Sequence, residues 1–319
     1  MANFINVADL TYCGKEAQEI FSKDIFALDI TKYGITLRDN VKGKEKLYTG
    51  ELGDVWQAYS CPFTPAGEAS LAEAFIEPAR IKVNMENCYD AFDNTYFVEQ
   101  TKATLEGGIP QSFGDWFFDR LRKRMAKEYQ EIFWKGDTDR DEATKGYLKV
   151  TDGIEKRLGE AVGVELIKGA AFTVDNIIAQ VEAAVMAAIA NAAEQEVDTE
   201  DFKVFMNRSD IRLLSVALGK ECCIANSSVA TFTNYAKEGD KIYVMGFEVV
   251  PTEQSASTVI VGPARNLVLG FDTFDSHIAY KLIDMRDTTG DNMFRVLALS
   301  NIAVGIVLPE LFVFSRISE

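Results

Sequence analysis

Three aspartates at alternate positions come closest in this chain to a metal-binding pattern. Asp137, Asp139 and Asp141 have the spacing with which a calcium loop directs carboxylates at one ion. Such a loop also needs a glycine at its sixth position and a bidentate acid at its twelfth, where this chain has Glu142 and Leu148. The sequence therefore predicts a solvated polar turn and no metal site.

The chain offers few residues for catalysis. His277 is its single histidine, which removes most hydrolase triads, histidine-based acid–base pairs and almost all zinc sites. Because His277 lies in an apolar stretch, we expect a structural role for it. Neither phosphate-cradling glycine motif occurs, and no carboxylate pair is singled out by its spacing. We expect no enzyme activity and no cofactor.

Composition narrows the possible partners. The 319 residues contain 33 Lys and Arg against 49 Asp and Glu, and this net charge of -16 argues against a nucleic-acid reader.

No run of about 18 apolar residues occurs, and the first ten residues lack the pattern of a secretory signal, so we expect a cytosolic chain without a membrane span. Five cysteines without a C-x-x-C pair suggest reduced thiols: Cys13, Cys61, Cys88, Cys222 and Cys223.

The segment Ile35–Val83 is rich in aromatic residues but has no sustained helical or strand periodicity. Long structureless loops in compact domains are usually functional or disordered, and disordered segments contain few aromatic residues. We therefore predict an extended arm that is buried on another copy of the chain. Its aromatic residues are Tyr48, Trp56, Tyr59, Phe63 and Phe75.

A long amphipathic helix is predicted for residues 112–135. Ser112 is its expected cap, and apolar residues recur every four positions from Phe113 to Phe133. Its other face is basic, with Arg120, Arg122, Lys123, Arg124 and Lys127. This basic face is either a solvated surface or a contact for an acidic partner.

The second half of the sequence predicts a different mixture of elements. Thr173 is expected to cap a helix with a small-residue face, and Ser209 to cap another that ends at Gly219. Phe202 to Met206 alternates like a strand, and Ile242 to Val250 reads as one strand that ends before Pro251. Further strands are predicted up to Leu308.

Four motifs in this order resemble the major capsid protein of tailed bacteriophages, which has the Hong-Kong-97-type fold. The long helix ends in Trp134-Lys135-Gly136-Asp137, and Gly146-Tyr147-Leu148 follows a polar turn. The other three motifs are the junction at residues 205–210, the strand block from Gly246 to Gly270, and the closing stretch from Val304 to Phe314. The match covers residues 112–314 by motif and the arm by position only. In the strand block, Phe247-Glu248 departs from the family's usual small residue and proline.

The resemblance implies an α+β fold in five parts: an N-terminal arm (1–34), an extended E-loop (35–83), a peripheral domain (84–168) with the spine helix, an axial domain (169–291), and a strand returning to the peripheral domain (292–319). It also implies self-assembly into pentamers and hexamers of an icosahedral shell around double-stranded DNA, in a virion assembled in the bacterial cytoplasm. The implied E-loop contacts are Lys42, Lys44, Lys46, Tyr48, Trp56, Tyr59, Phe63 and Phe75.

Other implications of the resemblance concern partners and covalent chemistry. Portal, decoration and separately encoded scaffolding proteins are expected, with weak DNA contact along the basic spine helix. Some relatives join an E-loop lysine to an asparagine through an isopeptide bond. Candidates here are Lys42, Lys44 and Lys46 with Asn292 or Asn301 and the base Glu310, although exposed loop lysines are the simpler reading.

Two alternatives stay open. An encapsulin, which is a cellular shell that holds enzyme cargo, has the same fold and would share every motif. A soluble carboxylate-based enzyme with a long covering loop is the alternative from another class, and it predicts a small oligomer.

Overall fold

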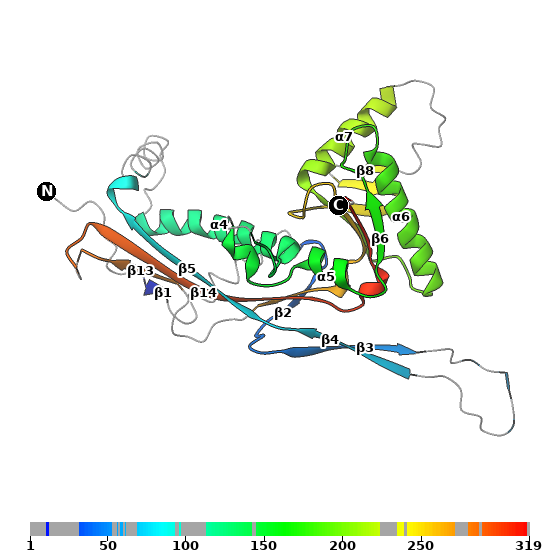
Figure 1. Ribbon diagram of the computed structural model, residues 1–319, viewed down its shortest axis with the longest axis horizontal. Coiled ribbons are helices and arrows are strands. Elements are labelled where there is room, and N and C mark those ends of the chain that lie inside the picture. Colours follow the sequence, from blue (N-terminus) through cyan, green and yellow to red (C-terminus); the bar gives the residue numbers. More distant parts are fainter. Residues whose placement is uncertain are drawn as a thin grey trace.

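The chain is organised by two β-sheets and a separate β-hairpin (Figure 1). The computed structural model describes residues 11–12, 32–52, 56, 58–59, 61, 69–92, 96, 113–141, 145–223, 235–238, 241–271, 280–286 and 289–317. The predicted N-terminal arm therefore lies almost entirely outside the described residues, as do Ser112, Phe63 and His277.

The first sheet has six strands in the order β1-β13-β14-β12-β2, with β5 paired to β14. Its strands are β1 (Thr11–Tyr12), β2 (Thr36–Arg38), β5 (Ala79–Cys88), β12 (Leu267–Phe271), β13 (Tyr280–Asp284) and β14 (Met293–Ile306). Strand β14 is the central strand of this sheet, because β5, β12 and β13 all pair with it in antiparallel fashion.

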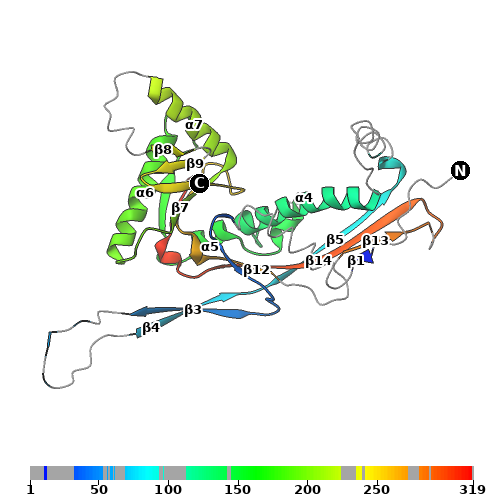
Figure 2. The same cartoon turned by 180° about the vertical axis from the view of Figure 1, so that it is seen from behind.

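Helix α4 (Phe113–Lys135) lies along one face of the six-stranded sheet (Figures 1 and 2). The stripe predicted from the sequence forms its buried face: Phe113, Phe117, Leu121, Tyr129 and Phe133 are buried, and Met125 is partly buried. The stripe packs against alternate residues of β14, which include Phe294, Val296 and Ala298. The predicted long helix is confirmed.

The second sheet has seven strands in the order β6-β15-β11-β7-β10-β9-β8. Its strands are β6 (Glu165–Gly169), β7 (Phe202–Asn207), β8 (Tyr235–Glu238), β9 (Lys241–Val244), β10 (Phe247–Thr252), β11 (Val259–Pro263) and β15 (Val313–Ile317). One face packs on α6 (Ile177–Glu194) and α7 (Arg208–Cys223), and the other on α5 (Ile154–Glu160) and the end of α4. There the rings of Trp134 and Phe205 lie 5.3 Å apart. Short 3₁₀ helices are η1 (Gly146–Lys149), η3 (Ala264–Asn266) and η4 (Pro309–Leu311).

Among the described residues, α6 is the one helix whose length and composition would allow it to cross a membrane. Its buried residues, including Val181, Val185 and Ala188, form a core with the seven-stranded sheet. That packing is typical of a core helix in a folded domain.

The two sheets do not follow the predicted domain ranges. Strands β12 and β13 fall within 169–291 but pair with β14, and β15 falls within 292–319 but pairs with β6 and β11. The chain crosses between the sheets three times: through α4 and α5 between β5 and β6, through η3 between β11 and β12, and through η4 between β14 and β15. Sequence order alone does not reveal such crossings.

Several predicted element boundaries were wrong, among them the start of α7, which is Arg208 and not a residue after a Ser209 cap, and the end of β10, which runs through Pro251 to Thr252. Helix α6 begins at Ile177, and the Thr173 N–H donates to the Asn176 side chain instead of Thr173 capping the helix. Helix α7 continues past Gly219 to Cys223. The strand predicted from Ile242 to Val250 is a hairpin, because Met245 and Gly246 have φ of 48° and 91° and turn the chain between β9 and β10.

The predicted structureless arm is a two-stranded hairpin. Strand β3 (Glu45–Leu52) pairs antiparallel with β4 (Ala69–Ile76) along its whole length, from Glu45 opposite Ile76 to Leu52 opposite Ala69. The hairpin projects from the body in both views (Figures 1 and 2). Backbone pairing, which needs no apolar periodicity, orders this segment.

Candidate functional site

The hairpin exposes large apolar side chains. Tyr48 and Phe75 on its strands are 58% and 43% exposed, and Trp56 and Tyr59 beyond β3 are 98% and 95% exposed. Monomeric proteins seldom expose so much aromatic surface on one projecting element unless a partner covers it. Of the eight predicted contact residues, Phe63 lies outside the described part.

The hairpin lysines are held by local interactions. Lys46 forms an ion pair of 2.8 Å with Glu73, and the ammonium groups of Lys44 and Lys46 lie 4.7 and 5.7 Å from the centre of the Phe75 ring. Lys42 is exposed. Lys44, Lys46 and Phe75 therefore form one mixed cationic and aromatic surface, in which cation–π contacts are available to a partner as well.

The hairpin base is anchored in the body. Val41, Leu47 and Ile76 are buried together with Val268 of β12 and Ala303 of β14. The Val41 N–H also donates to the Phe271 carbonyl at 3.1 Å. The hairpin is thus fixed at its base and solvated further out.

Helix α4 carries the predicted basic face, with one exception. Arg120, Lys123, Arg124 and Lys127 are exposed. Arg120 lies over the Trp116 ring at 4.7 Å, and Arg124 pairs with Glu128 at 2.6 Å. Arg122 lies about 200° around the helix from Arg120. Its side chain is only 29% exposed and pairs with Asp119 at 3.4 Å, so it does not share the basic face.

The turn that contains Asp137 and Asp139 binds the side chain of Lys156. Lys156 lies 2.8 Å from Asp137, 2.5 Å from Asp139 and 3.0 Å from Asp152. The hydrogen bonds to Asp137 and Asp139 raise the pKa of Lys156, and the Lys156 ammonium lowers the pKa of Asp137. Within the described ranges, no cluster of three or more His, Cys, Asp or Glu residues is arranged to hold a metal.

Close backbone packing at the end of α4 requires two glycines, Gly136 of the Trp134-Lys135-Gly136-Asp137 motif and Gly153. The Gly136 N–H donates to the Ile132 carbonyl, and the Gly153 N–H donates to the Gly136 carbonyl at 2.8 Å. A Cβ on Gly136 would overlap the Thr151 carbonyl, and one on Gly153 would lie 2.6 Å from the Gly136 nitrogen. Only glycine permits this backbone contact.

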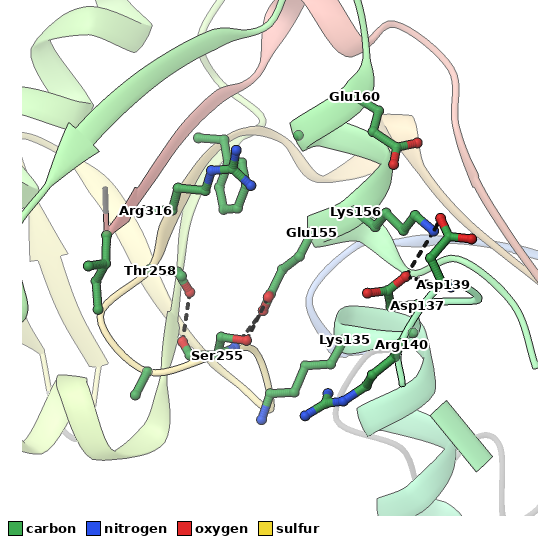
Figure 3. Close-up of a pocket in the computed structure, with 15 residues that line it drawn as sticks. Lys135, Asp137, Asp139, Arg140, Glu155, Lys156, Glu160, Ser255, Thr258 and Arg316 are labelled. Atoms are coloured by element: carbon green, nitrogen blue, oxygen red, sulfur yellow. Dashed lines mark hydrogen bonds and ion pairs between the residues drawn. The ribbon is translucent and has the colours of Figure 1, made fainter. Parts of the chain in front are cut away.

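A pocket of about 840 Å³ lies where α4, α5 and β15 meet the loop between β10 and β11 (Figure 3). Its charged lining comes from the end of α4 and the turn after it, from α5 and from β15: Lys135, Asp137, Asp139, Arg140, Glu155, Lys156, Glu160 and Arg316. Phe314, Ile317, Ala256 and Gly159 give it an apolar part. We call it the junction pocket.

Glu155 links the two sides of the junction pocket. Its carboxylate accepts hydrogen bonds from the Ser255 N–H and, at 2.7 Å, from the Ser255 hydroxyl (Figure 3). Burial raises the pKa of Glu155, and the Ser255 hydrogen bonds and the charge of Lys135 oppose that rise. Burial lowers the pKa of Lys135, and the charge of Glu155 opposes that fall.

The two candidate asparagines for a covalent cross-link and Glu310 each make local contacts within one subunit. The Asn292 amide donates to Asp90 at 2.7 Å, while the Asn301 carbonyl accepts from the Tyr129 hydroxyl at 3.0 Å. Both asparagines flank or belong to β14, nine positions apart, which corresponds to about 30 Å along a strand. The Glu310 carbonyl accepts from Asn191 at 2.7 Å. The bond remains a prediction.

Sequence reasoning missed the junction pocket and the Glu155–Ser255 contact. These two residues are 100 positions apart. The displacement of Arg122 from the basic face was available from helical geometry, since residues two apart on a helix point in nearly opposite directions.

The fold of this chain is similar to that of chains in solved phage structures. A chain in the structure of the satellite phage P4 procapsid including its size determination (Sid) protein aligns with a TM-score of 0.64 and 13% identity, over 98% of this chain and 94% of that chain. This chain has the Hong-Kong-97-type capsid fold.

Two further structures with the Hong-Kong-97-type arrangement give the same alignment of whole chains. The capsid of Myoviridae phage XM1 matches with a TM-score of 0.54 and 10% identity, over 98% and 95% of the two chains. The capsid of the empty GTA particle matches with a TM-score of 0.51 and 10% identity, over 100% and 96%. No family model and no curated protein matches the sequence.

Proposed function

We propose that this chain is the major capsid protein of a tailed phage and acts by assembly, without catalytic turnover. The observation that carries the proposal is the agreement of nearly the whole chain with the P4 procapsid structure, at a TM-score of 0.64. The exposed aromatic hairpin supports it, because a projecting element with a buried base and solvated aromatic side chains suits contact with another copy.

Assembly follows from the asymmetry of that contact. A hairpin that lies on a different surface of the next copy makes a heterologous contact, and such contacts close into rings. In this proposal the rings are pentamers and hexamers, and they tile a shell around double-stranded DNA. Portal, scaffolding and decoration proteins complete the particle in the bacterial cytoplasm.

The charge distribution suits a container for DNA. A net charge of -16 limits adhesion to packaged DNA, and the exposed basic residues of α4 provide weak, non-specific contacts. A shell that faces DNA with α4 therefore holds the genome without binding it tightly.

Expression of the chain, alone and with its scaffolding partner, tests the proposal. We expect elution in the void volume and round particles in negative stain. A small oligomer under both conditions would refute the shell. The matched variant lacks residues 50–71, with Asn-Gly joining Thr49 to Ala72, so that Leu47 and Ile76 remain in the base. We expect folded subunits that form no particles, and normal particles from this variant would contradict the role of the hairpin.

A further inference from the structure

Trp56 is an aromatic side chain without a binding site on its own subunit. It is 98% exposed, whereas Trp116 and Trp134 are 6% and 1% exposed. It follows β3, which extends about 16 Å beyond the buried Leu47 at its usual rise per residue. In both ribbon views β3 and β4 run past α5, which lines the junction pocket, and lie apart from it (Figures 1 and 2).

The junction pocket has the size and chemistry for an aromatic side chain. Its volume of about 840 Å³ lies within the range of small-ligand sites. Arg316 reaches into it from β15, with its guanidinium carbon 5.9 Å from the centre of the Phe314 ring (Figure 3). Lys135 and Arg140 line it and point in the same direction in Figure 3.

Cations beside an apolar wall favour an aromatic occupant. A guanidinium over an indole face gains cation–π attraction, which is strongest for tryptophan and increases when water is excluded. Ile317 of the pocket is 43% exposed and offers apolar surface, while the carboxylates of Asp137 and Asp139 are already paired with Lys156. Tryptophan and arginine pairs in pockets are also common energetic centres of protein interfaces.

We propose that Trp56 of one copy inserts into the junction pocket of a second copy and packs against Arg316. This inference rests on the proposed shell function and identifies a specific contact within it. Because the pocket is lined by the end of α4, which packs on the six-stranded sheet, and by β15 of the seven-stranded sheet, the inserted ring bridges these two regions of the receiving subunit. The hairpin then fixes the relative position of those regions as it joins the copies.

Trp56 fluorescence tests the insertion directly in particles of the full chain. The spectrum of Trp56→Phe particles contains only the tryptophan emission of Trp116 and Trp134. Subtracting it from the spectrum of natural particles isolates the emission of Trp56. We expect Trp56 emission to shift to shorter wavelength on assembly and acrylamide quenching to fall. Trp56→Ala and Arg316→Ala should each raise the protein concentration for half-assembly by about tenfold, and the double variant by no more than about twice that.

Two controls separate folding from contact. Circular dichroism and thermal unfolding of the unassembled variants should match those of the natural chain, since Trp56 and Arg316 are exposed. Arg212→Ala removes an exposed arginine on α7, outside the pocket, and should leave the half-assembly concentration unchanged.

Each other outcome rejects the insertion. Particles in which Trp56 stays solvated and quenchable would refute it while leaving the shell function intact. Protected Trp56 with additive effects of the two alanine variants would place the ring in another site. If the natural chain forms no particles, the shell function is refuted. If sedimentation then shows monomers with accessible Trp56, the inference is refuted as well.

Discussion

Ile76 at the end of β4 packs directly on Gly305 of β14, and a Cβ at position 305 would overlap the Ile76 Cγ2 atom. The same Cβ would lie 3.7 Å from the Leu47 Cδ1 atom. The anchoring of the hairpin therefore depends on the absence of a side chain in the central strand of the six-stranded sheet.

Replacing Gly305 with alanine should displace the hairpin base. We expect a loss of about 1–3 kcal/mol in the free energy of unfolding, because the added methyl group has no space. Urea unfolding of unassembled subunits measures the change. Gly146→Ala is the matched control, since nothing lies within 4 Å of its Cβ position. Equal stability of both variants would contradict the packing argument.

Lys156 is the shared partner of three aspartates, so Lys156→Met should leave their charges in mutual repulsion. Asp137 has a pKa below its usual 3.8, chiefly because of Lys156. A lowered folded-state pKa stabilises the fold above pH 3.8, and this contribution is lost as pH falls through the folded-state value.

The Lys156→Met variant should therefore have a melting temperature a few degrees lower at pH 7, with the difference shrinking below about pH 4. Thermal unfolding at both pH values measures it. Lys149→Met, which changes an exposed lysine nearby in the chain, should have no such effect. A deficit of the same size at both pH values would rule out the electrostatic explanation.

Sequence reasoning succeeded where side-chain burial is periodic. Helix α4 was predictable because Phe113, Phe117 and Leu121 form one buried stripe, and β7 because it begins with alternating apolar residues. It failed for β3 because each face of this strand mixes polar and apolar residues: Glu45 shares a face with Leu47, and Lys46 shares a face with Tyr48.

Long-range contacts set the other limit of prediction. The resemblance indicated the fold and the spine helix from short motifs, and the projecting arm from its position alone. It contained no information on the junction pocket, whose Glu155 and Ser255 meet only after the chain has formed β6 to β10 of the seven-stranded sheet. The pairing of β15 with β6 depends on a chain that leaves the seven-stranded sheet after β11 and returns to it.

Glu155→Gln tests the electrostatics of the junction pocket. Burial raises the folded-state pKa of Glu155 above its usual 4.5, so the wild-type fold loses stability as pH rises from about 4.5 through the folded-state value. Glutamine cannot lose a proton. The variant should therefore gain stability relative to the wild type between pH 4 and pH 7.5, as measured by urea unfolding at both. A relative loss over that interval would show that the Ser255 hydrogen bonds outweigh burial.

The basic face of α4 gives the last prediction, which concerns DNA. Arg120, Lys123 and Lys127 point outward, so replacing all three with glutamine removes three potential phosphate contacts per subunit. We expect normal particle formation but earlier release of packaged DNA on heating, with a weaker dependence of release on salt. Arg122→Gln is the control, because Arg122 lies on another side of α4 and pairs with Asp119. If the triple variant and Arg122→Gln release DNA alike, α4 does not face the genome. A solvated basic face would then be the correct reading of this surface.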